Sequence, residues 1–153
     1  MEKYHFQYCQ KIIIISQDKT KTLLCKRKGE ADYDGIFSFV GGKMETTDES
    51  LIDGLRREKI EEIGNDFKIK LLQTFSLNKL YRKKDGNTLI LPHYLAIYQI
   101  GEVHLNTDEY SEYKWVEIKE LEKFEPKVPN IPEVLEELLR LEKIATEEDF
   151  ILI

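Results

Sequence analysis

The sequence predicts an α/β protein in which a mixed β-sheet is sandwiched between α-helices. Segments rich in β-branched and apolar residues, typical of strands, fill most of the chain outside two stretches with helical periodicity. These two stretches, at about residues 49–63 and 130–141, are separated by a long run of predicted strands. At 153 residues the chain has the size of one ordinary domain. We therefore expect a single domain over residues 1–153.

The composition indicates a globular protein and argues against nucleic acid as a partner. Charged residues make up 34% of the chain and apolar residues 41%, which is typical of a packed domain. The formal net charge of −6 argues against nucleic-acid binding, which needs a basic surface. The apolar run near the N-terminus is too short to span a membrane. Cys9 and Cys25 lack metal-ligand spacing and fit free thiols, so we expect a cytoplasmic protein.

The first third of the chain reads as a hairpin followed by a glycine turn. The strand-like segments 4–16 and 20–28 flank a polar turn at residues 17–19 and predict a β-hairpin. A short strand at residues 36–40 then leads to Gly41 and Gly42. Adjacent glycines permit a sharp turn or a close approach of the backbone to a ligand.

A helix is expected from about Glu49 to Ile63, because Thr46, Thr47 or Asp48 can cap its start and Gly64 its end. On a helical wheel one side is apolar, and it comprises Leu51, Ile52, Leu55, Ile60 and Ile63. Lys59 falls near the middle of this apolar arc. We expect its ammonium either to reach past the sheet edge to solvent or to pair with an acid.

The second half of the chain predicts more strands and a second helix. Asp85 and Gly86 lie between two strand-like runs and indicate a hairpin turn. The remaining expected elements are strands at 67–84, 88–100 and 114–118, a short helix at 119–124 and an amphipathic helix from Asn130 to Leu141. The apolar tail, residues 150–153, is expected to pack on the domain or on a partner chain, so a homodimer is one expected assembly.

Three carboxylates of the first helix suggest a metal site. Glu58, Glu61 and Glu62 are three and four residues apart, so a helix presents them on one face. Carboxylates crowded in this way repel one another, and an oxygen-seeking cation such as Mg²⁺ or Mn²⁺ relieves the repulsion. A solvated acidic surface is the alternative that the spacing alone leaves open.

The pattern around these residues resembles the Nudix box, the signature of the Nudix hydrolase family. Six residues match the box in register, namely Glu49, Arg57, Glu58, Glu61, Glu62 and Gly64. The chain departs from the family pattern in its loop, where six residues rather than five separate Gly42 from Glu49. Lys59 and Asn65 also occupy two aliphatic positions of the box, and Val40 stands where many members have proline.

The resemblance implies the Nudix fold and a Mg²⁺-dependent hydrolase, with Mn²⁺ as an alternative metal. Its substrate would be a nucleoside diphosphate linked to another group, such as a nucleoside triphosphate or a dinucleoside polyphosphate. Glu58, Glu61 and Glu62 would hold the metal, and Gly41 and Gly42 would bring the backbone close to the phosphates. A catalytically weak nucleotide-binding or regulatory module with the same fold is the alternative.

The resemblance also implies roles for residues around the metal. Arg57 would pair with Glu49 and brace the catalytic loop against the helix. Glu61, or an acid of the late loop, would take the proton of the attacking water, and the two candidates from that loop are Glu109 and Glu112.

Two residues further from the box are expected to contact the substrate. Arg27, at the end of a strand, would contact substrate phosphates, although a solvated strand end is equally compatible with the sequence. Tyr81 lies seventeen residues beyond Gly64, a spacing found in members that act on diadenosine polyphosphates. A packing aromatic between strands is the alternative for this residue.

Overall fold

The structure is a computed structural model that describes residues 5–153, so the expected start of the first strand at Tyr4 lies outside it. Its strands are β1 (Phe6–Ile15), β2 (Lys21–Arg27), β3 (Phe37–Ser38), β4 (Val40–Lys43), β5 (Lys68–Leu72), β6 (Leu77–Arg82), β7 (Thr88–Ile100), β8 (Tyr110–Glu117) and β9 (Phe150–Leu152). The α-helices are α1 (Leu51–Ile63) and α2 (Ile131–Ile144), and the 3₁₀ turns are η1 (Ile118–Glu120) and η2 (Glu147–Asp149).

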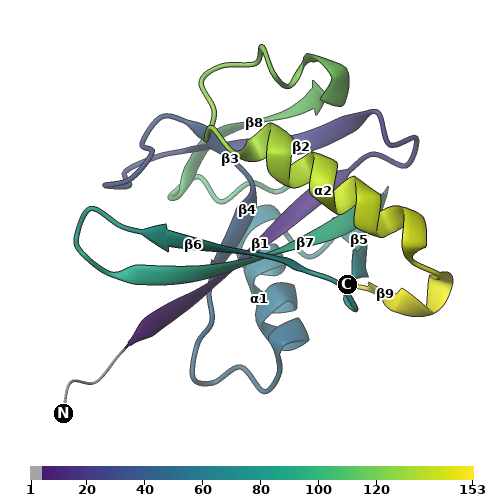
Figure 1. The fold of residues 1–153 in the computed structure, drawn as a ribbon, viewed down its shortest axis with the longest axis horizontal. Coiled ribbons are helices and arrows are strands. Elements are labelled where there is room, and N and C mark those ends of the chain that lie inside the picture. Colours follow the sequence, from purple (N-terminus) through teal and green to yellow (C-terminus); the bar gives the residue numbers. More distant parts are fainter. Residues whose placement is uncertain (1–4) are drawn as a thin grey trace.

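The sheet is mixed and carries a helix on each face, as predicted. β1 runs parallel to β7, whereas its other neighbours in the sheet pair with it in antiparallel fashion. Leu55 and Ile63 of α1 pack into one apolar cluster, and Val134 and Leu138 of α2 pack into another. Figure 1 shows α2 crossing one face of the strands and α1 lying on the other. The α/β/α arrangement is therefore confirmed.

The expected hairpin at the N-terminus exists only at its turn. β1 and β2 pair at Ile15 and Thr22, after which β1 continues beside β4 and β7 while β2 pairs along its length with β8. The reason lies in the run Ile12–Ile15, in which no residue is more than 1% exposed. A strand that is apolar on both faces must lie inside the sheet with a layer on each side.

The glycine pair forms part of a strand and not the turn that we expected. Gly41 and Gly42 lie within β4, opposite Lys11 and Gln10 of β1. Gly41 has a φ of +150°, and a Cβ there would lie 2.0 Å from the carbonyl oxygen of Gln10. The turn toward the helix follows, at residues 44–50. The glycines therefore allow two strands to approach closely beside the functional site.

Helix α1 begins later than expected and ends where expected. Its N-cap is Ser50, whose hydroxyl accepts a hydrogen bond of 3.1 Å from the amide of Asp53. Because Ser50 is the cap, the prediction that Thr46, Thr47 or Asp48 caps the helix was wrong. Gly64 forms the C-cap with a φ of +99°, and its amide donates to the carbonyl oxygen of Ile60.

Lys59 adopts neither of the two arrangements that we expected. Its side chain is buried, and the ammonium donates to the carbonyl oxygens of Phe67 at 2.8 Å and Gly64 at 3.4 Å. Burial lowers the pKa of this ammonium to about 8. The lysine therefore satisfies carbonyl groups in the turn that follows α1, where a favourable charge at the helix C-terminus is also expected.

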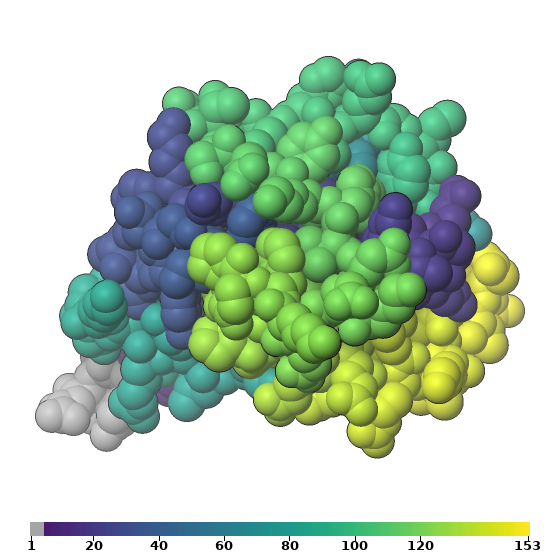
Figure 2. Space-filling view, turned by 90° about the horizontal axis from the view of Figure 1, so that it is seen from above, coloured from purple at the N-terminus to yellow at the C-terminus, as the bar shows by residue number. Residues whose placement is uncertain are grey.

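The elements after α1 largely follow the prediction. The hairpin of β6 and β7 is confirmed around Gly86, whereas residues 73–76 interrupt the single strand expected at 67–84. The short helix expected at 119–124 is reduced to η1, and α2 runs past Leu141 to Ile144. Figure 2 shows, from above, the green segment that contains β8 and η1 lying next to the yellow C-terminal residues.

The apolar tail joins the sheet of its own chain. β9 pairs antiparallel with β5, and Ile153 is 5% exposed. The expectation that the tail packs on the domain is therefore confirmed. Within residues 5–153, no helix is long and apolar enough to cross a membrane.

Candidate active site

A cavity of about 810 Å³ opens between α1, the β6–β7 hairpin and the start of α2. Carboxylates, basic side chains and aromatic side chains all line it. Its predicted lining residues are Arg27, Gly41, Gly42, Glu58, Glu61, Glu62, Tyr81 and Glu109. Residues that are far apart in the sequence therefore meet around one space large enough for a nucleotide.

The three helix carboxylates lie at different depths. Glu58 and Glu62 are 6% and 3% exposed, whereas Glu61 is exposed. Burial, together with the neighbouring carboxyl of Glu109, raises the pKa of the Glu62 carboxyl to about 9. Its Oε2 atom is buried and has no hydrogen-bond partner among the described residues. A buried acceptor without a donor is costly, and a cation at this position would relieve the cost.

Gly42 leaves the space that one of these carboxylates occupies. A Cβ on Gly42 would lie 2.0 Å from Oε2 of Glu58, so any larger residue would displace that carboxylate. The metal-coordinating atoms that these glutamates offer are all carboxylate oxygens, the ligand type that Mg²⁺ and Mn²⁺ prefer. A divalent cation held by Glu58, Glu61 and Glu62 fits three observations. These are the carboxylate oxygens, the unpartnered Oε2 atom of Glu62 and the space beside Gly42.

Arg57 pairs with Asp48 and not with Glu49, which corrects the expected brace. Its Nε and Nη2 atoms donate to the two carboxylate oxygens of Asp48, each at 2.8 Å. Arg57 lowers the pKa of Asp48 to about 2. Glu49 is exposed, and the longer loop accounts for the exchange because five residues, as in the family pattern, separate Gly42 from Asp48. Counting from the glycine rather than from the helix would have identified Asp48.

Arg57 also holds two of the proposed metal ligands. Its Nη1 atom lies 2.9 Å from Glu58 and 3.3 Å from Glu61. Among the residues described, no three His, Cys, Asp or Glu side chains are grouped tightly enough to form a ready-made metal cage. The guanidinium thus neutralises part of the carboxylate charge and occupies acceptor sites that a cation would also use.

The structure separates the two acids of the late loop. Glu109 lines the cavity beside Glu62. Glu112 is exposed on β8, where its carboxylate lies 3.7 Å from the ammonium of Lys26. Glu112 is not among the residues that line the cavity, and its strand pairs it with Lys26 of β2, so Glu109 is the late-loop acid that the structure brings to the cavity.

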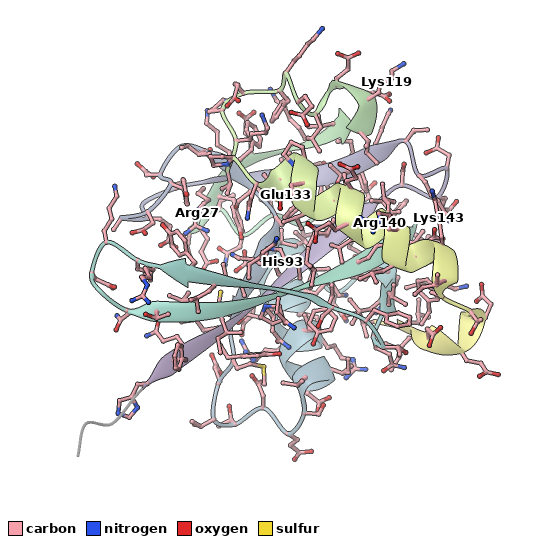
Figure 3. The ribbon with its side chains drawn as sticks, in the orientation of Figure 1. Arg27, His93, Lys119, Glu133, Arg140 and Lys143 are labelled. Atoms are coloured by element: carbon pink, nitrogen blue, oxygen red, sulfur yellow. The ribbon has the colours of Figure 1, made fainter. Side chains whose placement is uncertain are left out.

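Arg27 of β2 and Tyr81 of β6 also line the cavity. Arg27 is partly buried, and its guanidinium contacts the carbonyl oxygen of Asp32 at 3.3 Å and Glu30 at 3.4 Å. Tyr81 donates a hydrogen bond of 2.6 Å to Asp32. In Figure 3, Arg27 and His93 lie between β2 and the β6–β7 hairpin. Sequence reasoning missed Asp32, because an isolated acid in a polar loop carries no distinguishing pattern.

His93 is a second cavity residue that the sequence did not single out for function. It is 4% exposed, and its Nδ1 atom lies 2.8 Å from the carbonyl oxygen of Leu91 and 3.3 Å from that of Leu77. Two acceptors at Nδ1 require the proton there. Burial, with a contribution from Lys11, lowers the pKa of the imidazole to about 4. His93 is therefore neutral at pH 7.

Acid is expected to destabilise the protein through His93. Its pKa is about 4 in the folded protein and about 6.5 in the unfolded chain, so the unfolded chain binds more protons between these values. The free energy of unfolding should then fall as the pH drops from about 6.5 to about 4, by roughly 3 kcal/mol at most from this group. Urea unfolding at pH 7 and pH 4.5 measures the change. His93→Gln should show a smaller decrease, and an identical decrease in both proteins would contradict the assignment.

Comparison with known proteins identifies the family. The chain matches the family model of the NUDIX domain over residues 10–138. No curated protein matches it. The chain therefore belongs to the Nudix family. It is a Nudix-type pyrophosphohydrolase, an enzyme acting on phosphoric anhydrides.

Solved structures share its fold. The MutT protein from Methanosarcina mazei Go1 is 22% identical, with a TM-score of 0.70 over 94% of this chain and 99% of that one. An Ap4A hydrolase binary complex from C. elegans is 15% identical, with a TM-score of 0.70 over 90% and 98%. The NUDIX domain of Shewanella oneidensis NrtR complexed with ADP ribose is 18% identical, with a TM-score of 0.68 over 94% and 91%. Identities this low show a common fold.

Proposed function

We propose that this enzyme is a Mg²⁺-dependent hydrolase that cleaves the pyrophosphate bond of a nucleoside diphosphate linked to another group. Nucleoside triphosphates, their deoxy forms and dinucleoside polyphosphates are the substrates that we expect, and Mn²⁺ is an alternative metal. The observation that carries the proposal is the meeting of Glu58, Glu62 and Glu109 with Arg27 around one cavity. The carboxylates suit a metal, and the guanidinium suits a phosphate.

The side chains divide the work as follows. Bound Mg²⁺ supplies charge neutralisation on the pyrophosphate and acidifies a water molecule. Glu58, Glu61 and Glu62 hold this metal, and Arg27 contacts the phosphates. Glu61 or Glu109 accepts the proton of the attacking water, and both line the cavity.

Gly41 and Gly42 line the cavity and bring the backbone close to the phosphates, and Arg57 supports the metal ligands. The Nη2 atom of Arg57 donates to Asp48, and the Nη1 atom orients Glu58 and Glu61. Gly42 leaves the room that the carboxylate of Glu58 occupies.

The test is a product screen with a matched metal-free control. The protein is incubated with nucleoside triphosphates, ADP-ribose, dinucleoside polyphosphates and nucleotide sugars, with Mg²⁺ or with EDTA, and the products are identified by mass. We expect at least one substrate to release a nucleoside monophosphate or diphosphate only when Mg²⁺ is present. The masses of the products also show which phosphorus the water attacks when the reaction is run in ¹⁸O-labelled water.

A catalytically weak binding module is the competing function, and the same screen separates the two. The pairing of Arg57 with Glu58 and Glu61 favours this alternative, because it competes with the metal. A module of this kind would bind a nucleotide in calorimetry yet release no product with any member of the panel. That combination would refute the hydrolase proposal.

A further inference from the structure

The loop between β7 and β8, residues 101–109, is held against the C-terminal end of the helix that carries the proposed metal ligands. The amide of His104 donates to the carbonyl oxygen of Ile63 at 2.9 Å. The amide of Asn106 donates to the carbonyl oxygen of Glu62, also at 2.9 Å. The last carbonyl groups of a helix lack partners within the helix, and here the loop supplies two donors to them. The loop is therefore bonded directly to the backbone of a proposed metal ligand.

Gly101 lets this loop begin close to the turn that follows α1. Its φ is +101°, in the left-handed region that favours glycine. A Cβ on Gly101 would lie 1.9 Å from the carbonyl oxygen of Asp66, so a larger residue would have to displace backbone. The sequence thus makes room for the loop beside the end of the helix.

Asn106 organises the other end of the loop, where Glu109 lies. The Oδ1 atom of Asn106 accepts a hydrogen bond of 3.0 Å from the amide of Asp108. Its backbone carbonyl oxygen accepts from the amides of Glu109 at 3.2 Å and Tyr110 at 3.0 Å. Asparagine favours turns of this kind, because its short side chain reaches the backbone two residues on. One residue therefore receives three successive amides, and the middle one belongs to Glu109.

The end of β2 fixes Glu109 from a second direction. The amide of Lys28 donates to the carbonyl oxygen of Glu109 at 2.9 Å, and its ammonium donates to the carbonyl oxygen of Thr107 at 2.7 Å. Lys28 directly follows Arg27, the residue proposed to contact the phosphates. The amide and the carbonyl group of Glu109 are thus both bonded, although the residue is exposed. Backbone hydrogen bonds, rather than burial, set the place of this acid.

We infer that Asn106 is a positioning residue that holds Glu109 where it accepts the proton of the attacking water. In this step the water oxygen bonds to phosphorus, and the proton it loses passes to a carboxylate oxygen of Glu109. Glu61, the other candidate acceptor, pairs with Arg57 at 3.3 Å. Asn106 is not among the residues that line the cavity, so it acts through Glu109 and not on the substrate.

This inference rests on the proposed function, because it needs a hydrolytic step with a proton to transfer. It goes beyond that function in two ways. It assigns a role to Asn106, which belongs to neither the box nor the cavity wall. It also connects the metal ligand Glu62 to the proton acceptor Glu109 through one residue that is bonded to both.

The experiment compares two substitutions of Asn106 in the full chain, and both leave the backbone bonds in place. Asn106→Ala removes the acceptor of the Asp108 amide, whereas Asn106→Asp keeps an oxygen at the same position. With the substrate that the product screen identifies, we expect Asn106→Ala to lower kcat about tenfold, because small displacements of a catalytic group slow a reaction strongly. KM and the Mg²⁺ concentration that gives half-maximal activity should stay within about twofold. Asn106→Asp should recover most of the lost kcat.

Amide hydrogen exchange and thermal melting separate a local effect from a global one. In Asn106→Ala we expect faster exchange at the amides of Asp108 and Glu109, with a melting temperature within about 4 °C of the wild type. Thr107→Ala is the matched control, because Thr107 is exposed and the carbonyl group that it offers to Lys28 is retained. Its kcat should lie within about twofold of the wild type.

A double variant tests whether Asn106 acts through Glu109. Glu109→Gln cannot accept the proton, so its kcat should fall on the order of a hundredfold. Adding Asn106→Ala to this variant should then cause no further loss, because the group that Asn106 positions no longer works. A further loss of about tenfold in the double variant would mean that Asn106 acts on another group.

Several other results would overturn the inference. These are a wild-type kcat in Asn106→Ala, an equal loss in Asn106→Asp, unchanged exchange at the Asp108 and Glu109 amides, or a raised KM in place of a lowered kcat. Full activity in Glu109→Gln would refute the positioning role and leave Mg²⁺-dependent hydrolysis intact, with Glu61 as the remaining acceptor. A product screen without any substrate would instead refute the proposed function, and the role of Asn106 with it.

Discussion

Replacement of Glu62 by Gln is expected to reduce Mg²⁺-dependent turnover on the order of a thousandfold while leaving the protein folded. Glutamine matches the shape of the glutamate side chain but lacks the charge that a cation needs. The raised pKa of the Glu62 carboxyl shows that the metal-free fold favours the neutral form, so a neutral amide should be tolerated. The measurement is steady-state turnover across a Mg²⁺ titration, with thermal melting of each protein in EDTA.

The matched control for this variant is Glu112→Gln. It makes the same chemical change in an exposed acid that pairs with Lys26 outside the cavity. We expect turnover within about twofold of the wild type, since exposed ion pairs contribute little to stability and this acid lies outside the cavity. Wild-type rates in Glu62→Gln, or a large loss in Glu112→Gln, would show that the carboxylates have been assigned to the wrong roles.

The second large effect is expected at Asp48. Removing its side chain in Asp48→Ala leaves Arg57 without its two 2.8 Å contacts and frees the guanidinium to close more tightly on Glu58 and Glu61. Loss of a residue that orients metal ligands typically costs 10–100-fold in metal affinity or activity, and we expect a loss of about this size. The Mg²⁺ concentration that gives half-maximal activity and the maximal rate are measured separately. The half-maximal Mg²⁺ concentration should rise, because the metal is held less tightly.

Glu49→Ala is the natural comparison, because it alters the neighbouring residue that the family pattern points to. Glu49 is exposed, so its loss should change the half-maximal Mg²⁺ concentration by less than about twofold. The reverse order of effects would mean that Arg57 pairs with Glu49 in the working enzyme. Asp48→Glu adds a further comparison, since a longer acid that restores the pair should recover part of the lost affinity.

The carboxylates of α1 could be predicted because their geometry is local. Spacing of three and four residues fixes which side chains share a helix face, whatever the rest of the chain does. The glycines before the helix were predicted to approach a ligand, and the cradle at Gly42 depends on the same lack of a side chain. Their strand conformation could not be foreseen, because it depends on pairing with β1 from a distant part of the sequence.

Non-local features account for the errors. Asp48 replaces Glu49 because the longer loop returns toward Arg57 one residue earlier, and loop paths are not encoded by periodicity. The early hairpin separates because β1 pairs with β4 and β7, which come from later parts of the chain. The link between Asp32 and Tyr81 spans 49 residues, so no local pattern announces it.

The buried ammonium of Lys59 has a consequence for the direction of the catalytic groups. A helix packed only by aliphatic side chains can rotate slightly about its axis, because apolar contacts have little directionality. Lys59 instead fastens α1 at a defined angle, through hydrogen bonds to carbonyl oxygens after the helix. Glu58 directly precedes Lys59, and Glu62 follows it within one turn. The same hydrogen bonds therefore set the direction in which both carboxyl groups point. The ammonium on the apolar side of the helix thus limits rotation of the helix and so fixes the direction of the carboxyl groups that face the cavity.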